Sequence, residues 1–242
     1  VSLIKGFEVS SNDINLISEV ITDTLGIECA ALSGANVAQD IAERQFSEST
    51  IGCRRFMDAG VLQLLFDVPY FKIGMVRDVA GVQIYGSLKN IVALAAGFVD
   101  GLGLDSNTKA AIIRMGVEEM RRFTKVFYPE VLRSTMWDSC GIADVLTTCY
   151  GGRNRRVAER FVQEKTRSWN ELEAEMLGGQ KLQGVLTAAE VFEFLSSNGK
   201  LQDFPFFSQV HQICTGSEEP NSIIGAFMNE DLKPFNIETR GV

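Results

Sequence analysis

The sequence contains a single histidine, and this scarcity excludes several kinds of active site. His211 is alone among 242 residues, and its segment, FFSQVHQIC, has the pattern of an ordinary amphipathic helix. A zinc cluster, a Ser-His-Asp triad or a Cys-His pair would need this one residue to serve alone. We therefore expect any acid–base chemistry to come from a lysine or a carboxylate.

Paired cysteines and basic runs are also lacking. The five cysteines lie far apart, the closest two being Cys140 and Cys149. This spacing predicts no metal site and indicates small, reduced, buried thiols in an intracellular protein. The net charge of -8, without a basic patch of more than a few residues, argues against a nucleic-acid partner.

The first residues, VSLIKG, include no basic region followed by an apolar signal-peptide core, so nothing predicts export. They read as the middle of a strand, and we expect further sequence upstream. A transit peptide would lie there too, so we expect a cytoplasmic protein with a plastid as the alternative. Residues 231–242 have no purpose that the sequence indicates.

The longest apolar stretch is residues 79–99, VAGVQIYGSLKNIVALAAGFV, which has one charge, Lys89, at its middle. About 20 apolar residues are enough to cross a bilayer as a helix. However, Gln83, Ser87, Lys89 and Asn90 crowd the centre, where a lysine costs roughly 2.5 to 3.5 kcal/mol. The pattern therefore predicts a helix buried inside a soluble protein and no membrane span.

A buried lysine needs a partner or a purpose, because desolvation lowers the pKa of its ammonium group. On a helix, Gly86, Ala93 and Ala96 share the face of Lys89, so its side chain has room to point into a cleft. Two interpretations stay open. Lys89 is either chemical machinery or a structural lysine paired with a carboxylate.

Strand and helix patterns alternate up to residue 78. Strands are expected at 27–32, 50–53 and 71–76, with helices near 37–44 and 59–66. Ser11 or Asn12 is expected to cap an earlier helix, whose apolar positions run from Ile14 to Leu25.

From residue 79 on, only helices are expected, and no internal repeat is evident. Ser106 is predicted to cap a long helix that ends near Tyr128. Two capping boxes, Ser168 with Glu171 and Thr187 with Glu190, are predicted to open later helices.

A candidate anion site follows in the stretch 144–156, DVLTTCYGGRNRR. Asp144 and Thr148 are one helical turn apart on one face. After two glycines a new helix starts, and its first turn carries Arg153, Arg155 and Arg156. Cations are unfavourable at this positive end of the helix dipole. Free backbone N–H groups and a guanidinium there suit a bound phosphate, and a solvated basic turn is the alternative.

Two glycine-containing segments complete the candidates. The polar loop 178–184, GGQKLQG, has glycine at both ends and is predicted to be a mobile lid that contributes Lys181 and Gln183. Gly101-Leu-Gly103 looks like the start of a dinucleotide fingerprint but follows no strand, so we interpret it as a turn between two helices.

Five segments together resemble the NAD-dependent glycerol-3-phosphate dehydrogenases of eukaryotic type. The resemblance implies an α/β tail of a Rossmann-like dinucleotide domain over residues 1–78, and an all-α substrate-binding and dimerisation domain over 79–242, built around the long buried helix. The family's glycine-rich fingerprint, G-x-G-x-x-G, does not occur in this sequence. The segments are SLIKG (2–6), GSLKN (86–90), SNTKAA (106–111), DVLTTCYGGRNRRVAE (144–159) and GQKLQG (179–184).

This resemblance also implies a reaction, the reversible NADH-dependent reduction of dihydroxyacetone phosphate to sn-glycerol 3-phosphate, by a homodimer. Lys89 would be the general acid and base, with Lys5 and Asp144 lining the same site. The remaining roles are substrate binding by Asn90, Thr148, Arg153 and Asn154, and cofactor binding by Arg153, Lys181 and Gln183.

Two other functions stay open. A related dehydrogenase could act on a hydroxy acid, whose carboxylate would replace the phosphate. A helical module could bind a phosphate-bearing ligand, or dimerise, without turnover.

Overall fold

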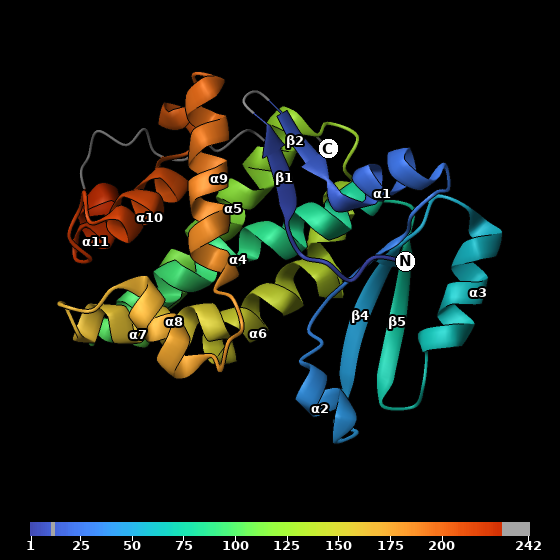
Figure 1. Ribbon diagram of the computed structural model, residues 1–242, viewed down its shortest axis with the longest axis horizontal. Helices are drawn as coiled ribbons and strands as arrows, with labels where there is room; N and C mark the ends of the chain where they lie inside the picture. The colour runs from blue at the N-terminus through green and yellow to red at the C-terminus, as the bar shows by residue number, and fades with distance from the viewer. Residues whose placement is uncertain (11–12, 229–242) are drawn as a thin grey trace.

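The computed structural model describes residues 1–10 and 13–228. A small sheet with its helices lies at one side of the molecule, and a group of helices surrounds α4 (Val79–Gly101) (Figure 1). The expected fold class, an α/β segment followed by an all-α region around a long buried helix, is confirmed. Ser11 and Asn12, the predicted cap, and the tail at 231–242 lie outside the described residues.

The N-terminal segment forms a β-hairpin before its first helix. β1 (Phe7–Ser10) pairs antiparallel with β2 (Asp13–Leu16), and α1 (Ile17–Leu25) follows. The predicted helix therefore starts too early, since Ile14 lies in strand β2. The alternation in Asp-Ile-Asn-Leu, with its second and fourth side chains buried, is a strand pattern that overrides the helical spacing.

The second sheet has the strand order β3-β4-β5, with β3 antiparallel to β4 and β4 parallel to β5. A helix connects the two parallel strands, as such pairs require. Each strand and helix lies within a few residues of its expected place. The bounds are β3 (Ala31–Ser33), α2 (Ala38–Ala42), β4 (Ser47–Gly52), α3 (Phe56–Phe66) and β5 (Phe71–Val76).

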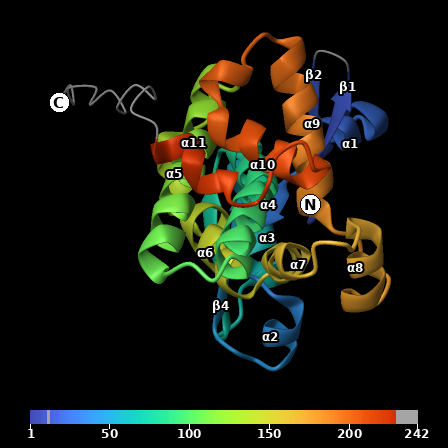
Figure 2. The same ribbon diagram turned by 90° about the vertical axis from the view of Figure 1, so that its left-hand side faces the viewer.

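Helix α4 is enclosed on all sides, with α5 on one side of it and α9 on the other (Figure 2). Asp78 caps it by accepting the N–H of Gly81 at 2.8 Å, and also accepts the N–H of Leu132 at 2.9 Å. The helix is long and apolar enough to cross a membrane, but its whole apolar window is buried inside the protein. Its interpretation as a core helix is confirmed.

The helices after α4 follow the expected order. The capping box of Ser168 and Glu171 is present, but two other cap predictions are wrong. Asp105, one residue before Ser106, caps α5 by accepting the N–H of Thr108 at 3.0 Å, and its charge suits the helix dipole. Thr187 lies inside α9, where its hydroxyl bonds the preceding turn. The helices are α5 (Ser106–Phe127), α6 (Asp144–Gly151), α7 (Arg153–Gln163), α8 (Trp169–Met176), α9 (Gln183–Ser197), α10 (Pro205–Thr215) and α11 (Ser222–Met228).

Residues 1–10 and 13–16 connect the two parts of the molecule. Ser2 forms a parallel bridge with Ala31 at the sheet. A few residues later, Phe7 and Leu16 pack into the same apolar core as α4. The intervening segment, which includes Lys5, is therefore held at both ends over the junction between sheet and helices.

Helices α4 and α7 approach each other closely because α4 has glycine at the contact. A Cβ atom on Gly97 would lie 2.3 Å from the carbonyl oxygen of Arg155 and 2.6 Å from the Cβ of Ala158. A Cβ on Gly101 would lie 2.6 Å from the Cβ of Val162. The backbone of α7 is thus placed against α4 with no room for a side chain between them.

We expect Gly97→Ala to lower the free energy of unfolding by about 2 kcal/mol, because the new methyl group would overlap a backbone atom that cannot turn aside. Urea unfolding measures the change. Gly60→Ala is the matched control, since Gly60 lies in α3 with open space around its Cβ position. This control should stabilise by up to about 1 kcal/mol. Equal effects of the two substitutions would contradict the close contact.

Candidate active site

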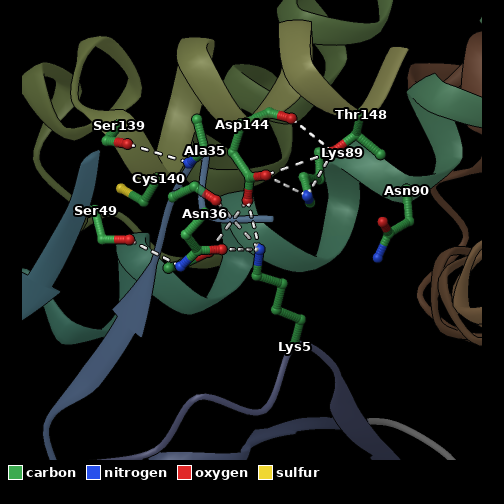
Figure 3. A network of polar contacts seen from close by, with 12 residues as sticks. Lys5, Ala35, Asn36, Ser49, Lys89, Asn90, Ser139, Cys140, Asp144 and Thr148 are labelled. Carbon is green, nitrogen blue, oxygen red and sulfur yellow. Dashed lines mark hydrogen bonds and ion pairs between the residues drawn. The ribbon is translucent and has the colours of Figure 1, made fainter. Parts of the chain in front are cut away.

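Lys89 lies near the middle of α4 and its ammonium group is buried against two side chains of α6. It donates to the carboxylate of Asp144 and, at 2.6 Å, to the hydroxyl of Thr148 (Figure 3). Burial lowers the pKa of Lys89 to about 8, although the charge of Asp144 opposes this shift. The side chain therefore changes its protonation state close to physiological pH, as an acid–base group must.

Asp144 is shared between two lysines. Its second carboxylate oxygen accepts from the ammonium group of Lys5 at 2.9 Å (Figure 3). The same oxygen lies 3.4 Å from the hydroxyl of Ser33. Asp144 directly follows a π-helical turn, Ser139–Ala143, and this turn sets the direction of the first turn of α6. Two cations around one carboxylate leave an excess positive charge, which favours an electron-rich ligand atom.

The sequence did not indicate the other partners of Lys5. Its ammonium group lies 3.4 Å from the carbonyl oxygen of Gly34 and 3.4 Å from the side-chain oxygen of Asn36. The amide of Asn36 donates in turn to the hydroxyl of Ser49 at 2.8 Å. A glycine and an asparagine just beyond the carboxyl end of a strand were the available signal, because ligand sites gather at such ends.

Gly86 explains how the sheet reaches this part of α4. A Cβ atom there would lie 2.4 Å from the hydroxyl oxygen of Ser33. A larger residue would require the side chain of Ser33 to move. The glycine one turn before Lys89 thus allows the sheet and the helix to share one polar site.

A second polar group lies beside the first. Asn154, in the first turn of α7, donates to the side-chain oxygen of Asn90 at 2.9 Å, and its own oxygen accepts the N–H of Gly184 at 2.9 Å. Both asparagines are buried. These bonds connect three helices, α4, α7 and α9, through one amide.

Two arginines of the first turn of α7 have different partners. Arg153 is exposed and bonds the side chain of Gln180 in the 178–184 loop. Arg155 pairs with Asp100 of α4 and with Glu159 of its own helix. The predicted anion site therefore retains Arg153 and the helix end, while Arg155 belongs to a different contact.

The 178–184 loop is hinged by glycine at one end only. Gly178 and Gly179 have positive φ angles, 55° and 87°. Gly184 is helical instead, and a Cβ there would lie 2.8 Å from the side-chain oxygen of Asn154. Lys181 is largely exposed and pairs with Glu173 at 2.8 Å, and Gln183 is the first residue of α9. Motion of the loop stays a prediction.

In the described residues, the side chains of the histidine and the cysteines make no hydrogen bond to those of Lys5, Lys89 or Asp144, although Cys140 (Figure 3) and Cys149 are buried close to them. His211 stacks on the ring of Phe192 in α9, with centroids 4.1 Å apart. Four of the five cysteines are buried and Cys29 is partly so. Gly101-Leu-Gly103 joins α4 to α5, as expected for an interhelical turn.

Two family models match the chain. One, described as NAD-dependent glycerol-3-phosphate dehydrogenase C-terminus, matches residues 78–225. The other, described as the N-terminus of the same enzyme, matches residues 1–59.

Curated proteins and solved structures agree with these matches. The chain is 54% identical to a chloroplastic NAD(+) glycerol-3-phosphate dehydrogenase of Arabidopsis thaliana over 93% of its length, and 51% identical to a cytoplasmic one of Drosophila melanogaster over 95%. It spans 56% and 63% of those proteins. A glycerol-3-phosphate dehydrogenase structure from Plasmodium falciparum superposes with a TM-score of 0.90 at 43% identity, over 96% of this chain and 65% of that one. One from Coxiella burnetii gives 0.83 at 27% identity, over 93% and 67%.

Proposed function

We propose, on the premise that this chain belongs to the NAD-dependent glycerol-3-phosphate dehydrogenase family, that its protein reversibly reduces dihydroxyacetone phosphate to sn-glycerol 3-phosphate. The observation that carries the proposal is a buried ammonium group, Lys89, bonded to a carboxylate that a second lysine shares. Reduction of a ketone builds negative charge on its oxygen. A buried cation that can also release a proton stabilises that charge and neutralises it.

The proton step can be written for this site. NADH supplies a hydride to the carbonyl carbon when it is bound. The electron pair of the C=O double bond moves to oxygen, and the ammonium group of Lys89 donates its proton there and becomes a neutral amine. In the reverse direction the amine takes the proton of the alcohol. Asp144 favours the ammonium form, and Lys5 adds a second positive charge beside the oxygen.

The first turn of α7 suits the phosphate group of the substrate. A helix N-terminus offers backbone N–H groups to an anion, and the guanidinium of Arg153 can add charge-assisted hydrogen bonds. The amide nitrogen of Asn154 carries a second N–H besides the one that Asn90 accepts. Thr148, which bonds Lys89, and Asn90, the next residue of α4, complete the lining that we propose.

The chemistry of the 178–184 loop and the adjoining helix ends fits part of a nicotinamide dinucleotide. The pyrophosphate of the dinucleotide is anionic, and two exposed cations lie here, Lys181 in the loop and Arg153 at the start of α7. We propose that these two residues and Gln183 hold the cofactor from this side.

The decisive experiment uses the natural full-length protein with NADH and dihydroxyacetone phosphate. We expect oxidation of NADH, measured as a loss of its absorbance, and formation of glycerol 3-phosphate. Turnover of keto acids in place of the phosphorylated ketone would favour a hydroxyacid dehydrogenase. Ligand binding without any turnover would leave a non-catalytic module.

We expect Arg153→Ala to raise the KM for dihydroxyacetone phosphate by about tenfold or more, because a hydrogen bond to a charged group contributes about 1.5 to 3 kcal/mol. kcat should change less, since the phosphate is bound alike before and during the reaction. Arg160→Ala is the control, because Arg160 lies near the other end of α7 and pairs with Glu164. An effect on the KM for NADH alone would mean that Arg153 serves the cofactor.

The cellular location and the oligomeric state are predictions that rest on the family alone. Relatives are named as cytoplasmic or chloroplastic, and we propose the cytoplasm, with a plastid as the alternative. We also propose a homodimer, which the mass of the full-length protein in solution would test.

A further inference from the structure

Asp100 of α4 pairs with two cations, one from α5 and one from α7. It lies at the last turn of the helix, and its carboxylate bonds Lys109 of α5 at 2.7 Å and also the guanidinium of Arg155 of α7. All three side chains are largely buried, with 11–20% of each exposed. Ion pairs in such surroundings are screened much less than surface pairs.

This group lies away from the reacting lysine. Asp100 is eleven residues beyond Lys89, which corresponds to roughly 16 Å along a helix axis. Its contacts nevertheless reach a second helix of the site. Arg155 is the neighbour of Asn154, whose amide bonds Asn90 at 2.9 Å.

The backbone contact at Gly97 explains why this pair can set a position. The carbonyl oxygen of Arg155 lies against Gly97, so α7 touches α4 backbone to backbone at this residue. This contact sets the distance between the two helices. The bond from Asp100 to the side chain of the same arginine adds a polar tie near the end of α4, and it favours the register in which Asn154 faces Asn90.

We propose that Asp100 is a positioning residue for the substrate phosphate, acting through Arg155. The inference rests on the proposed function, because it assigns phosphate binding to the first turn of α7. The pair also neutralises one of the three positive charges of that turn, which the helix dipole disfavours. Arg153 of the same turn bonds Gln180 of the 178–184 loop, on the side where we propose the ligand.

The proposal predicts which substitutions share an effect. Asp100→Asn and Arg155→Met should each raise the KM for dihydroxyacetone phosphate about tenfold, with kcat within about threefold, because the phosphate contacts are made in substrate and transition state alike. The double variant should raise KM no further than either single one. Lys109→Met is the matched control. It removes the other ion pair of the same carboxylate but leaves the bond to Arg155, so KM should stay within about twofold.

The experiment measures KM, kcat and urea unfolding for these four variants of the full-length protein, together with the binding of glycerol 3-phosphate by calorimetry. Binding should weaken in parallel with KM, and Lys109→Met should lower stability without weakening it. A rise in KM that follows stability loss in all variants, Lys109→Met included, would overturn the proposal. Should Asp100→Asn fail to fold, Arg155→Met and Lys109→Met still give the comparison. An inactive wild type would instead reject the proposed function.

Discussion

Replacement of Lys89 by alanine is expected to lower kcat for dihydroxyacetone phosphate by at least about a hundredfold, the usual scale for a positioned acid–base group. The ammonium group is buried against Asp144 and Thr148, and water has little room to replace it in a defined position. Steady-state NADH oxidation by the full-length protein measures the loss. A kcat near that of the wild type would exclude Lys89 as the proton donor.

Lys89→Arg separates proton transfer from charge. A guanidinium keeps the positive charge but is not deprotonated in proteins, so it stabilises an oxyanion without releasing a proton. We expect this variant to remain at least about tenfold below the wild type in kcat. Full activity of Lys89→Arg would mean that the site supplies charge alone and that the proton comes from elsewhere.

Asp144→Asn is expected to shift the pH dependence of the reaction to lower pH. The carboxylate is the main influence that raises the pKa of Lys89 against desolvation and against the charge of Lys5. Ketone reduction needs the ammonium form, which exists below the pKa. In the wild type its rate should therefore fall as pH rises through about 8, and in the variant this fall should occur at least about one unit lower.

The reverse reaction should have the opposite dependence on pH. Alcohol oxidation needs the neutral amine, so its rate should rise through about pH 8 in the wild type and at lower pH in Asp144→Asn. The variant should also lose about 3 to 5 kcal/mol of stability, because the buried Lys89 and the partly exposed Lys5 lose their shared partner. Asp67→Asn removes an exposed pair with Lys72 and should alter neither profile. An unchanged profile in Asp144→Asn would contradict the coupling.

The central helix could be predicted from the sequence because its signals are local. The 21-residue stretch 79–99, with a single charge, is more apolar than a surface helix, and the polar residues at its centre argue against a membrane span. The hairpin before α1 was missed for the opposite reason. Its strands are four residues each, too short to outweigh the helical spacing that Ile14 and later residues also satisfy.

The sequence predicted which residues belong to the site better than it predicted which of them contact one another. Lys5, Lys89, Asp144, Asn90 and Asn154 came from local motifs and a family resemblance. Which of them touch depends on helix packing that spacing does not encode, as the different partners of Arg153 and Arg155 show. Asn36 was missed because a lone asparagine in a loop has no periodicity to mark it.

The order of the helices along the chain leaves the apolar surface of α4 exposed during synthesis. This helix leaves the ribosome before α5 to α10, which cover it, so roughly 5 to 20 s pass with its apolar surface bare at ordinary rates of translation. A bare helix of this length competes for the membrane-insertion route. The cost of about 2.5 to 3.5 kcal/mol for a central lysine opposes that route. The lysine that lies at the centre of the site thus also makes insertion of the newly made helix into a membrane less favourable.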